Sequence, residues 1–124
     1  MKYSIITPVY NREDCIARCI ESVLYQKNIN ELDGEFEHII INDGSNDLTD
    51  AICKKYAKEN SLIKYISFPE NKGTNAARNA GIKIASGTFC IILDSDDYFV
   101  DNALQIINNI ISKSTYNYYM FCSD

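Results

Sequence analysis

Three aspartates, Asp94, Asp96 and Asp97, follow directly after the apolar run 89–93. Such a run indicates a buried strand, which would deliver the carboxylates to its carboxyl end. Because side chains alternate along an extended chain, we expect Asp94 and Asp96 on one side and Asp97 turned away or opening the next segment. Two carboxylates ~4 Å apart repel by about 4 kcal/mol at an effective dielectric of ~20, and a bound divalent cation would reverse that repulsion.

The oxygen atoms of such carboxylates suit Mg²⁺ or Mn²⁺. These cations usually take their remaining ligands from water and from substrate phosphates. The acidic stretch therefore predicts a site for a metal and a diphosphate. The alternative is an acidic turn in which Asp96 or Asp97 only caps the helix that follows.

Three further side chains could bind a nucleotide. Asp43 follows a predicted strand, and its carboxylate could accept the N3–H of uracil, or the N1–H and 2-amino group of guanine, and would reject cytosine. Tyr10 could stack its ring on a base for ~1–3 kcal/mol. Arg78 lies among small neighbours in a helix, so its planar guanidinium could reach a diphosphate or a nucleoside. An ordinary role stays open for each: an Asx turn with Gly44, an exposed tyrosine and an exposed arginine.

Strands and helices alternate along the predicted chain. Apolar runs and turn residues predict strands at 3–7, 36–42, 62–68, 89–93 and 116–122, and helical spacing predicts helices at 12–26, 48–59, 74–85 and 102–112. This order is typical of an α/β protein with a mainly parallel sheet and right-handed crossovers. Ligands of such sheets bind outside the carboxyl ends of the strands, so the four polar stretches should converge at one edge.

Single residues add detail to this prediction. Pro8 should end the first strand because it cannot donate to a ladder, and Asn11 should cap the first helix. Gly81 inside a helix costs about 1 kcal/mol relative to alanine, which suggests that a backbone or a ligand approaches closely there. The lone His38 opens a strand and is expected to be half-exposed. Four isoleucines are expected in the centre of the core: Ile5, Ile40, Ile66 and Ile92.

The composition limits the possible classes of function. The 124 residues are expected to form one domain, and 12 basic against 17 acidic residues give a net charge of −5 without a long basic run, which argues against nucleic-acid binding. The apolar runs are far shorter than the ~20 residues of a membrane helix, and the N-terminus lacks the pattern of a signal peptide. Five cysteines without a Cys-x-x-Cys pair argue against structural zinc or disulfides. A cytoplasmic protein is expected.

Four stretches of the chain resemble the signature sequences of family 2 glycosyltransferases, in the order in which that family has them. They are TPVYNRE at 7–13, INDGSND at 41–47, NKGTNAARNAG at 71–81 and LDSDD at 93–97. The resemblance covers residues 1–124 nearly continuously and implies a Rossmann-like three-layer α/β/α GT-A fold with a mainly parallel sheet. It also implies the inverting transfer of a sugar from a nucleotide-sugar, a UDP-sugar first of all, with Mn²⁺ or Mg²⁺ as cofactor.

Carried over residue by residue, the resemblance gives roles to side chains of these stretches. It implies that the nucleoside is surrounded by Thr7, Pro8, Tyr10, Glu13 and Asp43. It implies further nucleotide-sugar contacts, with Arg78 near the nucleotide and Asp94 and Ser95 near the ribose or the sugar. Asp96 is implied as the metal ligand, and Asp97 is left without a firm role.

The chain departs from the family at its C-terminal end. Family members continue with an acceptor-binding half that carries the catalytic base, whereas this sequence ends at Asp124. Residues 1–124 are therefore expected to be a truncated fold, the donor-binding domain of a longer enzyme, with no catalytic residue of their own and with the base beyond Asp124. The truncated edge should expose apolar surface, and self-association is expected through Tyr118, Tyr119, Met120 or Phe121.

The resemblance also implies a saccharide or lipid-linked acceptor and a place in the synthesis of cell-surface polysaccharide. A full-length protein of this kind would be cytoplasmic or would work at the inner face of the membrane.

Two other classes of protein share features with this sequence, and a third is excluded. A sugar-phosphate nucleotidyltransferase has a related fold but would need a Gly-rich, basic phosphate loop after the first strand, and PVYN at 8–11 offers none. A non-enzymatic, Mg²⁺-binding receiver-like module would need a lysine near its last strand, and no lysine follows Lys113. A dinucleotide oxidoreductase is excluded because no Gly-x-Gly-x-x-Gly follows a strand.

Overall fold

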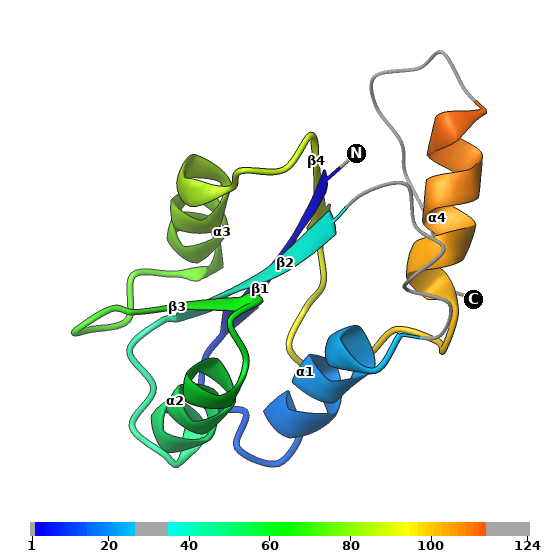
Figure 1. Ribbon diagram of the computed structural model, residues 1–124. Coiled ribbons are helices and arrows are strands. Elements are labelled where there is room, and N and C mark those ends of the chain that lie inside the picture. Colours follow the sequence, from blue (N-terminus) through cyan, green and yellow to red (C-terminus); the bar gives the residue numbers. More distant parts are fainter. Residues whose placement is uncertain (1, 27–34, 114–124) are drawn as a thin grey trace.

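A parallel β-sheet with helices on both faces forms the framework of the protein (Figure 1). The computed structural model describes residues 2–26 and 35–113. The strands are β1 (Lys2–Val9), β2 (Glu35–Asn42), β3 (Ile63–Ser67) and β4 (Phe89–Ile92). The helices are α1 (Ile16–Leu24), α2 (Thr49–Glu59), α3 (Thr74–Ile84) and α4 (Ala103–Ser112). The strand order is β3-β2-β1-β4, and each neighbouring pair is parallel.

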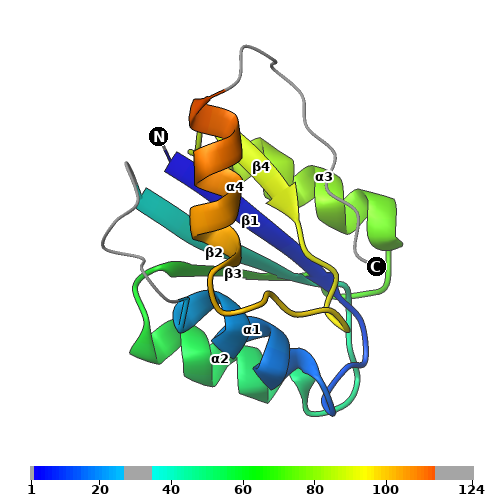
Figure 2. The ribbon, with the colours of Figure 1, turned by 90° about the vertical axis from the view of Figure 1, so that its right-hand side faces the viewer.

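The helices are divided between the two faces of the sheet. α3 packs on β1 and β2 from one side, while α1, α2 and α4 lie on the other (Figures 1 and 2). The predicted parallel, three-layer arrangement is thus confirmed. The predicted strand 116–122 and the predicted contact surface 118–121 lie outside the described residues. None of the helices in the described part has the length and apolar character that crossing a bilayer requires.

Alternating side chains of the central strands enter two separate cores. The side of α1, α2 and α4 holds a large buried cluster that includes Tyr3, Ile5 and Ile40. The α3 side holds a smaller one, formed by Ile6, Ile39, Ile41 and Ala77. The isoleucine run 39–41 of β2 therefore serves both cores, as expected for a parallel strand that is covered on both faces.

Two of the four isoleucines predicted at the centre of the core, Ile5 and Ile40, are fully buried. Ile66, on the outer strand β3, is only half-buried. The prediction for Ile92 is wrong, because its side chain is 41% exposed. Ile92 is paired with Ile6 on the α3 side of the sheet. α3 packs over β1 and β2, so this face of the outer strand β4 has little cover within the described part.

α3 comes unusually close to the sheet at Gly81. A Cβ atom at this position would lie 2.5 Å from Ile6 Cγ2 and 2.9 Å from Ile41 Cδ1. The close approach predicted at Gly81 is confirmed, but side chains of the smaller core cause it rather than a backbone or a ligand. A larger residue here would push α3 away from the sheet.

β1 continues through Pro8, so the prediction that Pro8 ends the strand is wrong. Successive residues of β1 direct their backbone groups to β2 and to β4 in turn. Val9 O accepts the Asp43 N–H at 2.8 Å on the β2 side, whereas Ile6 O accepts the Leu93 N–H at 2.9 Å on the β4 side. The backbone of Pro8 faces β4, as that of Ile6 does. Because β4 ends close to this point, an N–H at Pro8 would have no partner in the ladder, and the strand loses no hydrogen bond.

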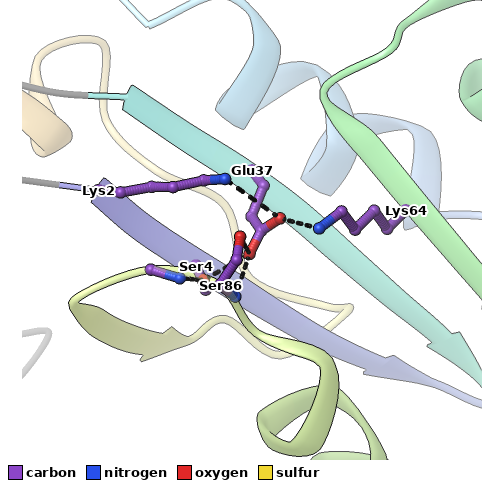
Figure 3. A network of polar contacts seen from close by, with 6 residues as sticks. Lys2, Ser4, Glu37, Lys64 and Ser86 are labelled. Atoms are coloured by element: carbon purple, nitrogen blue, oxygen red, sulfur yellow. Dashed lines mark hydrogen bonds and ion pairs between the residues drawn. The ribbon is translucent and has the colours of Figure 1, made fainter.

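A buried carboxylate connects the strands on the α3 side (Figure 3). Glu37 of β2 is 3% exposed, and its Oε1 accepts hydrogen bonds from Ser4 Oγ, the Ser86 N–H and Ser86 Oγ at 2.7, 2.8 and 2.9 Å. Its Oε2 lies 2.5 Å from the ammonium group of Lys64 and 3.9 Å from that of Lys2. Burial alone would raise the pKa of Glu37, but Lys64 and the serine hydrogen bonds outweigh it and lower the pKa to about 2.

The lone histidine lies inside the core, so the prediction of a half-exposed position is wrong. His38 of β2 is fully buried, its Nε2 lies 2.7 Å from Thr7 Oγ1, and its Nδ1 has no hydrogen-bond partner in the described part of the chain. The position differs from the expectation because β2 is covered on both faces, so even its polar residues are buried. Burial disfavours the imidazolium ion and lowers the pKa of His38 to about 3.

Protonation of His38 should make the stability of the protein depend on pH. In the unfolded chain the ring takes up a proton below about pH 6.5, whereas in the folded protein it stays neutral down to about pH 3. The free energy of unfolding should be highest above about pH 6.5 and fall by up to about 1.4 kcal/mol per pH unit as the pH decreases toward 5. Urea unfolding at several pH values between about 7 and 5 measures this slope.

Two variants separate His38 from the neighbouring buried carboxylate of Glu37. Because the chain contains one histidine, His38→Gln should remove the slope, whereas Glu37→Gln should keep it. The folded pKa of Glu37 is depressed from 4.5 to about 2, so its contribution to stability is lost only as the pH falls from about 4.5 toward 2. Equal stability of the parent protein at about pH 7 and 5 would contradict a buried, neutral His38.

Candidate functional site

A pocket of about 460 Å³ lies beyond the carboxyl ends of the strands, within the size range of small-molecule sites. Its walls come from the segments after β1, β2 and β4 and from α3. The lining residues are Pro8, Val9, Tyr10, Asn11, Arg12, Asp43, Thr74, Arg78, Asp94, Ser95 and Asp96. All four stretches that were expected to converge contribute to this surface, as a parallel sheet requires.

The acidic stretch enters the pocket as a turn rather than as the extended chain that the prediction assumed. The Asp97 N–H bonds to Asp94 O at 3.0 Å and closes this turn shortly after β4. Asp94, Asp96 and the buried Ser95 face the pocket, whereas Asp97 is not part of the lining that the described residues form. Asp97 is thus separated from Asp94 and Asp96, but Ser95 lines the pocket together with these two, which the alternation of an extended chain would not produce.

Arg78 reaches from α3 across the pocket to the acidic turn. Its Nη2 donates to Asp94 Oδ1 at 3.1 Å, and both side chains keep contact with solvent. The Nε–H of Arg78 is buried without an acceptor among the described residues, so a ligand in the pocket could accept a bond from it. Asp96 is exposed. The carboxylate of Asp94 is therefore already paired with the guanidinium of Arg78, whereas the carboxylate of Asp96 faces the solvent side of the pocket.

The buried carboxylate of Asp43 holds the loop that leads into α3. Its Oδ1 accepts the Lys72 N–H at 2.7 Å, and its Oδ2 accepts the Gly73 N–H at 3.0 Å and a bond from Asn71 Nδ2 at 3.2 Å. An ionised carboxylate has about four acceptor positions, so Asp43 can accept a further bond from the pocket. Neither interpretation drawn from the sequence, a base contact or an Asx turn with Gly44, included this anchoring role.

The loop after β1 is tied to the loop after β2. Asn11 has a φ of 49°. Its N–H donates to Ser45 Oγ and its Oδ1 accepts the Asn46 N–H, both at 2.9 Å. The prediction that Asn11 caps the first helix is wrong, because α1 begins only at Ile16 and the Asn11 side chain braces the two loops instead. The brace presents Tyr10, 43% exposed, at the pocket wall.

Two of the predicted site residues, Thr7 and Glu13, do not line the pocket that the described residues form. Thr7 is fully buried and faces His38 in the core. Glu13 Oε2 accepts the Leu48 N–H at 3.1 Å, just before α2. Thr7 thus belongs to the core, and Glu13 links the loop after β1 to the start of α2.

Four lining residues were not singled out from the sequence as ligand contacts: Val9, Asn11, Arg12 and Thr74. Val9, Asn11 and Arg12 lie within the stretch 7–13. This stretch follows a predicted strand, and that position could have identified them as residues of the site. Thr74 opens α3, and its place in the stretch 71–81, just before Arg78, is the corresponding signal.

The acidic groups of the pocket fit a hard divalent cation that is bound partly by its substrate. The part of the chain that the structure describes contains no group of three or more His, Cys, Asp or Glu side chains that could hold a metal by themselves. Asp96, with Asp94 beside it, offers carboxylate oxygens at the pocket wall. Mg²⁺ is typically bound through one or two carboxylates together with phosphate and water oxygens.

Known proteins resemble this chain over nearly its whole length. A family model described as Glycosyl transferase family 2 matches residues 4–123. Glycosyltransferase GlyA of Streptococcus pneumoniae serotype 4 is 35% identical over 127 residues, which cover 97% of this chain and 17% of that relative. The poly(ribitol-phosphate) beta-glucosyltransferase of Bacillus spizizenii is 39% identical over 105 residues, which cover 84% of this chain and 16% of that relative. The chain thus spans about a sixth of the length of these curated relatives.

Two solved structures have a similar backbone. S. aureus TarS 1-349 in complex with UDP-GlcNAc matches with a TM-score of 0.80 at 32% sequence identity, covering 91% of this chain and 32% of that chain. The mannosyltransferase PcManGT from Pyrobaculum calidifontis, in complex with GDP-Man and Mn²⁺, matches with a TM-score of 0.72 at 19% identity, covering 87% of this chain and 31% of that chain. At this identity the second match shows a shared fold alone.

Proposed function

Because the chain belongs to glycosyl transferase family 2, we propose that it forms the donor-binding part of an enzyme that transfers a sugar from a nucleotide-sugar, most simply a UDP-sugar. One observation carries the proposal: Asp43, Arg78 and the acidic turn with Asp94 and Asp96 surround one pocket although they are separated in the chain. Their chemistry complements a nucleoside, a diphosphate and a divalent cation. The UDP-GlcNAc complex of TarS supports UDP as the nucleotide.

The nucleoside is proposed to bind between the loop after β1 and Asp43. Tyr10 offers an exposed ring at the pocket wall on which a base can stack, for ~1–3 kcal/mol. Asp43 keeps acceptor capacity on the pocket side, which suits the N3–H of uracil. Pro8 forms part of the wall, whereas Thr7 and Glu13 lie outside the lining that the described residues form.

The diphosphate and the cation are proposed to lie between Arg78 and Asp96. Arg78 offers a positive charge and an Nε–H that lacks an acceptor within the described part. Asp96 offers its carboxylate to Mn²⁺ or Mg²⁺. When bound, the cation would stabilise the negative charge that develops on the leaving diphosphate. Asp94, held by Arg78 at 3.1 Å, and Ser95 are assigned to the ribose or the sugar.

An inverting transfer needs its general base on the side of the sugar opposite the leaving diphosphate. Asp96 is assigned to the cation, and Asp94 lies beside it in the same turn, so the proposal puts both on the diphosphate side of the sugar. Neither is proposed as the base, and we assign no catalytic residue among the described residues. A saccharide or lipid-linked acceptor and a role in cell-surface polysaccharide synthesis are part of the proposal. The name of the poly(ribitol-phosphate) relative supports this acceptor class.

Replacing Asp96 tests the metal site. Asp96→Asn should weaken UDP binding in the presence of Mn²⁺ at least tenfold, or about 1.4 kcal/mol, because a neutral amide binds a hard cation less well than a carboxylate does. The melting temperature should stay unchanged or rise, because the substitution relieves the repulsion between Asp94 and Asp96. Titration calorimetry of UDP with Mn²⁺ or with a chelator measures the first effect, and thermal unfolding measures the second.

A matched control removes the same charge elsewhere. Asp14 is exposed and lies outside the lining of the pocket, so Asp14→Asn should bind UDP with Mn²⁺ as the parent does. If Asp96→Asn also kept the full Mn²⁺-dependent affinity, Asp96 would be only a turn residue and the metal assignment would be wrong.

Replacing Asp43 tests the nucleoside assignment. Asp43→Ala should abolish a preference for UDP over CDP, because cytosine lacks the N3–H that the carboxylate would accept. Since Asp43 also holds the loop 71–73, Asn71→Ala serves as the control: it removes the 3.2 Å contact to the carboxylate but should retain the preference. The measured quantity is the ratio of the two dissociation constants, and a ratio near one in the parent would refute the assignment.

A further inference from the structure

Side chains of α1, and of Gln26 just beyond its end, hold the segment that carries the proposed metal ligand. The segment 94–104 runs from the acidic turn past α1 and into the first turn of α4 (Figure 2). Arg18 Nη2 donates to Asp96 O at 3.3 Å, and Cys19 Sγ donates to Asp94 O at 3.7 Å. The Phe99 N–H donates to Ser22 Oγ at 3.0 Å. Gln26 Nε2 donates to Val100 O, and Gln26 Oε1 accepts the Leu104 N–H, both at 2.8 Å.

The residues that make these contacts share one side of the helix. Arg18 and Ser22 are four residues apart, Cys19 is three residues before Ser22, and Gln26 continues the spacing just beyond the helix end. Because their partners are backbone atoms, these side chains fix the path of the segment rather than recognise its side chains.

Ser22 and Gln26 are the firmest of these anchors. Ser22 Oγ also donates to Cys19 O at 2.7 Å, and Gln26 Nε2 also donates to Ser22 O at 2.8 Å. The side chain of Gln26 is 5% exposed, and its amide both donates and accepts. A buried amide whose hydrogen bonds are satisfied is held in one orientation and stiffens its surroundings.

Gln26 also supplies a helix cap that α4 itself lacks. The N-cap residue Asn102 makes no side-chain capping bond within the described part. The Leu104 N–H is one of the first-turn donors that have no acceptor inside the helix, and Gln26 Oε1 accepts it. Gln26 thereby fixes the start of α4 to the end of α1, and with it the far end of the acidic loop.

The side chain of Asp96 depends on this backbone for its position. Asp96 is exposed in an irregular stretch between β4 and α4, and its backbone O is held by Arg18. The guanidinium of Arg18 also lies over the Tyr98 ring, 4.6 Å from the centroid. A Mg²⁺ or Mn²⁺ site demands well-defined ligand geometry, so the path of this backbone decides where the carboxylate stands.

We propose that Ser22 and Gln26 are positioning residues for the metal site: they hold the segment 94–104 so that the Asp96 carboxylate can bind a divalent cation together with the diphosphate. The inference rests on the proposed function. It implies that loss of either anchor lowers the contribution of the metal to UDP binding. The nucleoside contacts, which come from the loops after β1 and β2, should remain.

The test measures UDP binding by calorimetry with Mn²⁺ and with a chelator, for the parent chain, Ser22→Ala and Gln26→Leu. The gain in affinity that Mn²⁺ brings should fall at least about fivefold in each variant, while the affinity without metal stays within about twofold of the parent. Ser22→Thr, which keeps the hydroxyl group, should retain the gain. In hydrogen exchange, the Phe99 amide of Ser22→Ala and the Leu104 amide of Gln26→Leu should exchange at least about tenfold faster.

A control on the same helix separates positioning from general stability. Glu21 Oε1 accepts a hydrogen bond from Tyr56, so this polar contact ties α1 to α2 and not to the segment 94–104. Glu21→Ala should lower the melting temperature but keep the gain from Mn²⁺. If Glu21→Ala loses the gain as Ser22→Ala does, the effect is one of stability and the positioning role is wrong.

The outcomes distinguish this inference from the proposed function. If the parent gains affinity from Mn²⁺ and both anchor variants keep that gain, the positioning role is overturned while the proposed function stands. If the parent itself gains nothing from Mn²⁺, the proposed metal site is wrong and the positioning role falls with it. Should Gln26→Leu not fold, Ser22→Ala decides, because unchanged exchange of its Phe99 amide would show that the hydroxyl does not hold the segment.

Discussion

The arrangement of the pocket depends on one buried carboxylate that joins two loops. Asp43, at the end of β2, accepts hydrogen bonds from the loop 71–73 and so fixes where α3 begins. α3 carries Arg78, and Arg78 bonds to Asp94 after β4. The loop after β1 is tied to the loop after β2 through Asn11. Polar contacts between loops therefore join the four stretches to one another, while the sheet brings their ends to one edge.

The elements with strong local signals could be predicted from the sequence. Apolar runs and helical spacing identified the described strands and helices, and the family and its GT-A fold are confirmed. Their convergence also followed, because the carboxyl ends of parallel strands meet at one edge. The predicted boundaries were less accurate where a residue has an unusual backbone role. α1 begins only after the turn that Asn11 opens. Pro8 remains in β1, because its nitrogen faces the end of β4, where the ladder needs no donor.

The partners of single side chains could not be predicted, because they come from distant parts of the chain. A strand pattern shows that a residue such as His38 lies on a strand, but its burial depends on the helices that cover the sheet. Ile92 is exposed for the converse reason, since α3 packs elsewhere. Gln26 was recognisable only as the end of a helical pattern, although it caps a helix 78 residues away. The roles of the pocket residues toward a ligand remain proposals, because local spacing does not show what they bind.

The network around Glu37 has a consequence for how the strands pair. The isoleucine run 39–41 gives β2 nearly the same apolar side chains on both faces, so these residues alone specify its register weakly. A slip by one residue would exchange the two faces and would move Glu37 into the large cluster, away from Lys64. Leaving a buried charge without its partner costs about 3–5 kcal/mol. Glu37 therefore disfavours the alignment slipped by one residue and favours the observed alignment of β1, β2 and β3, which sets where the strand ends and the pocket loops lie.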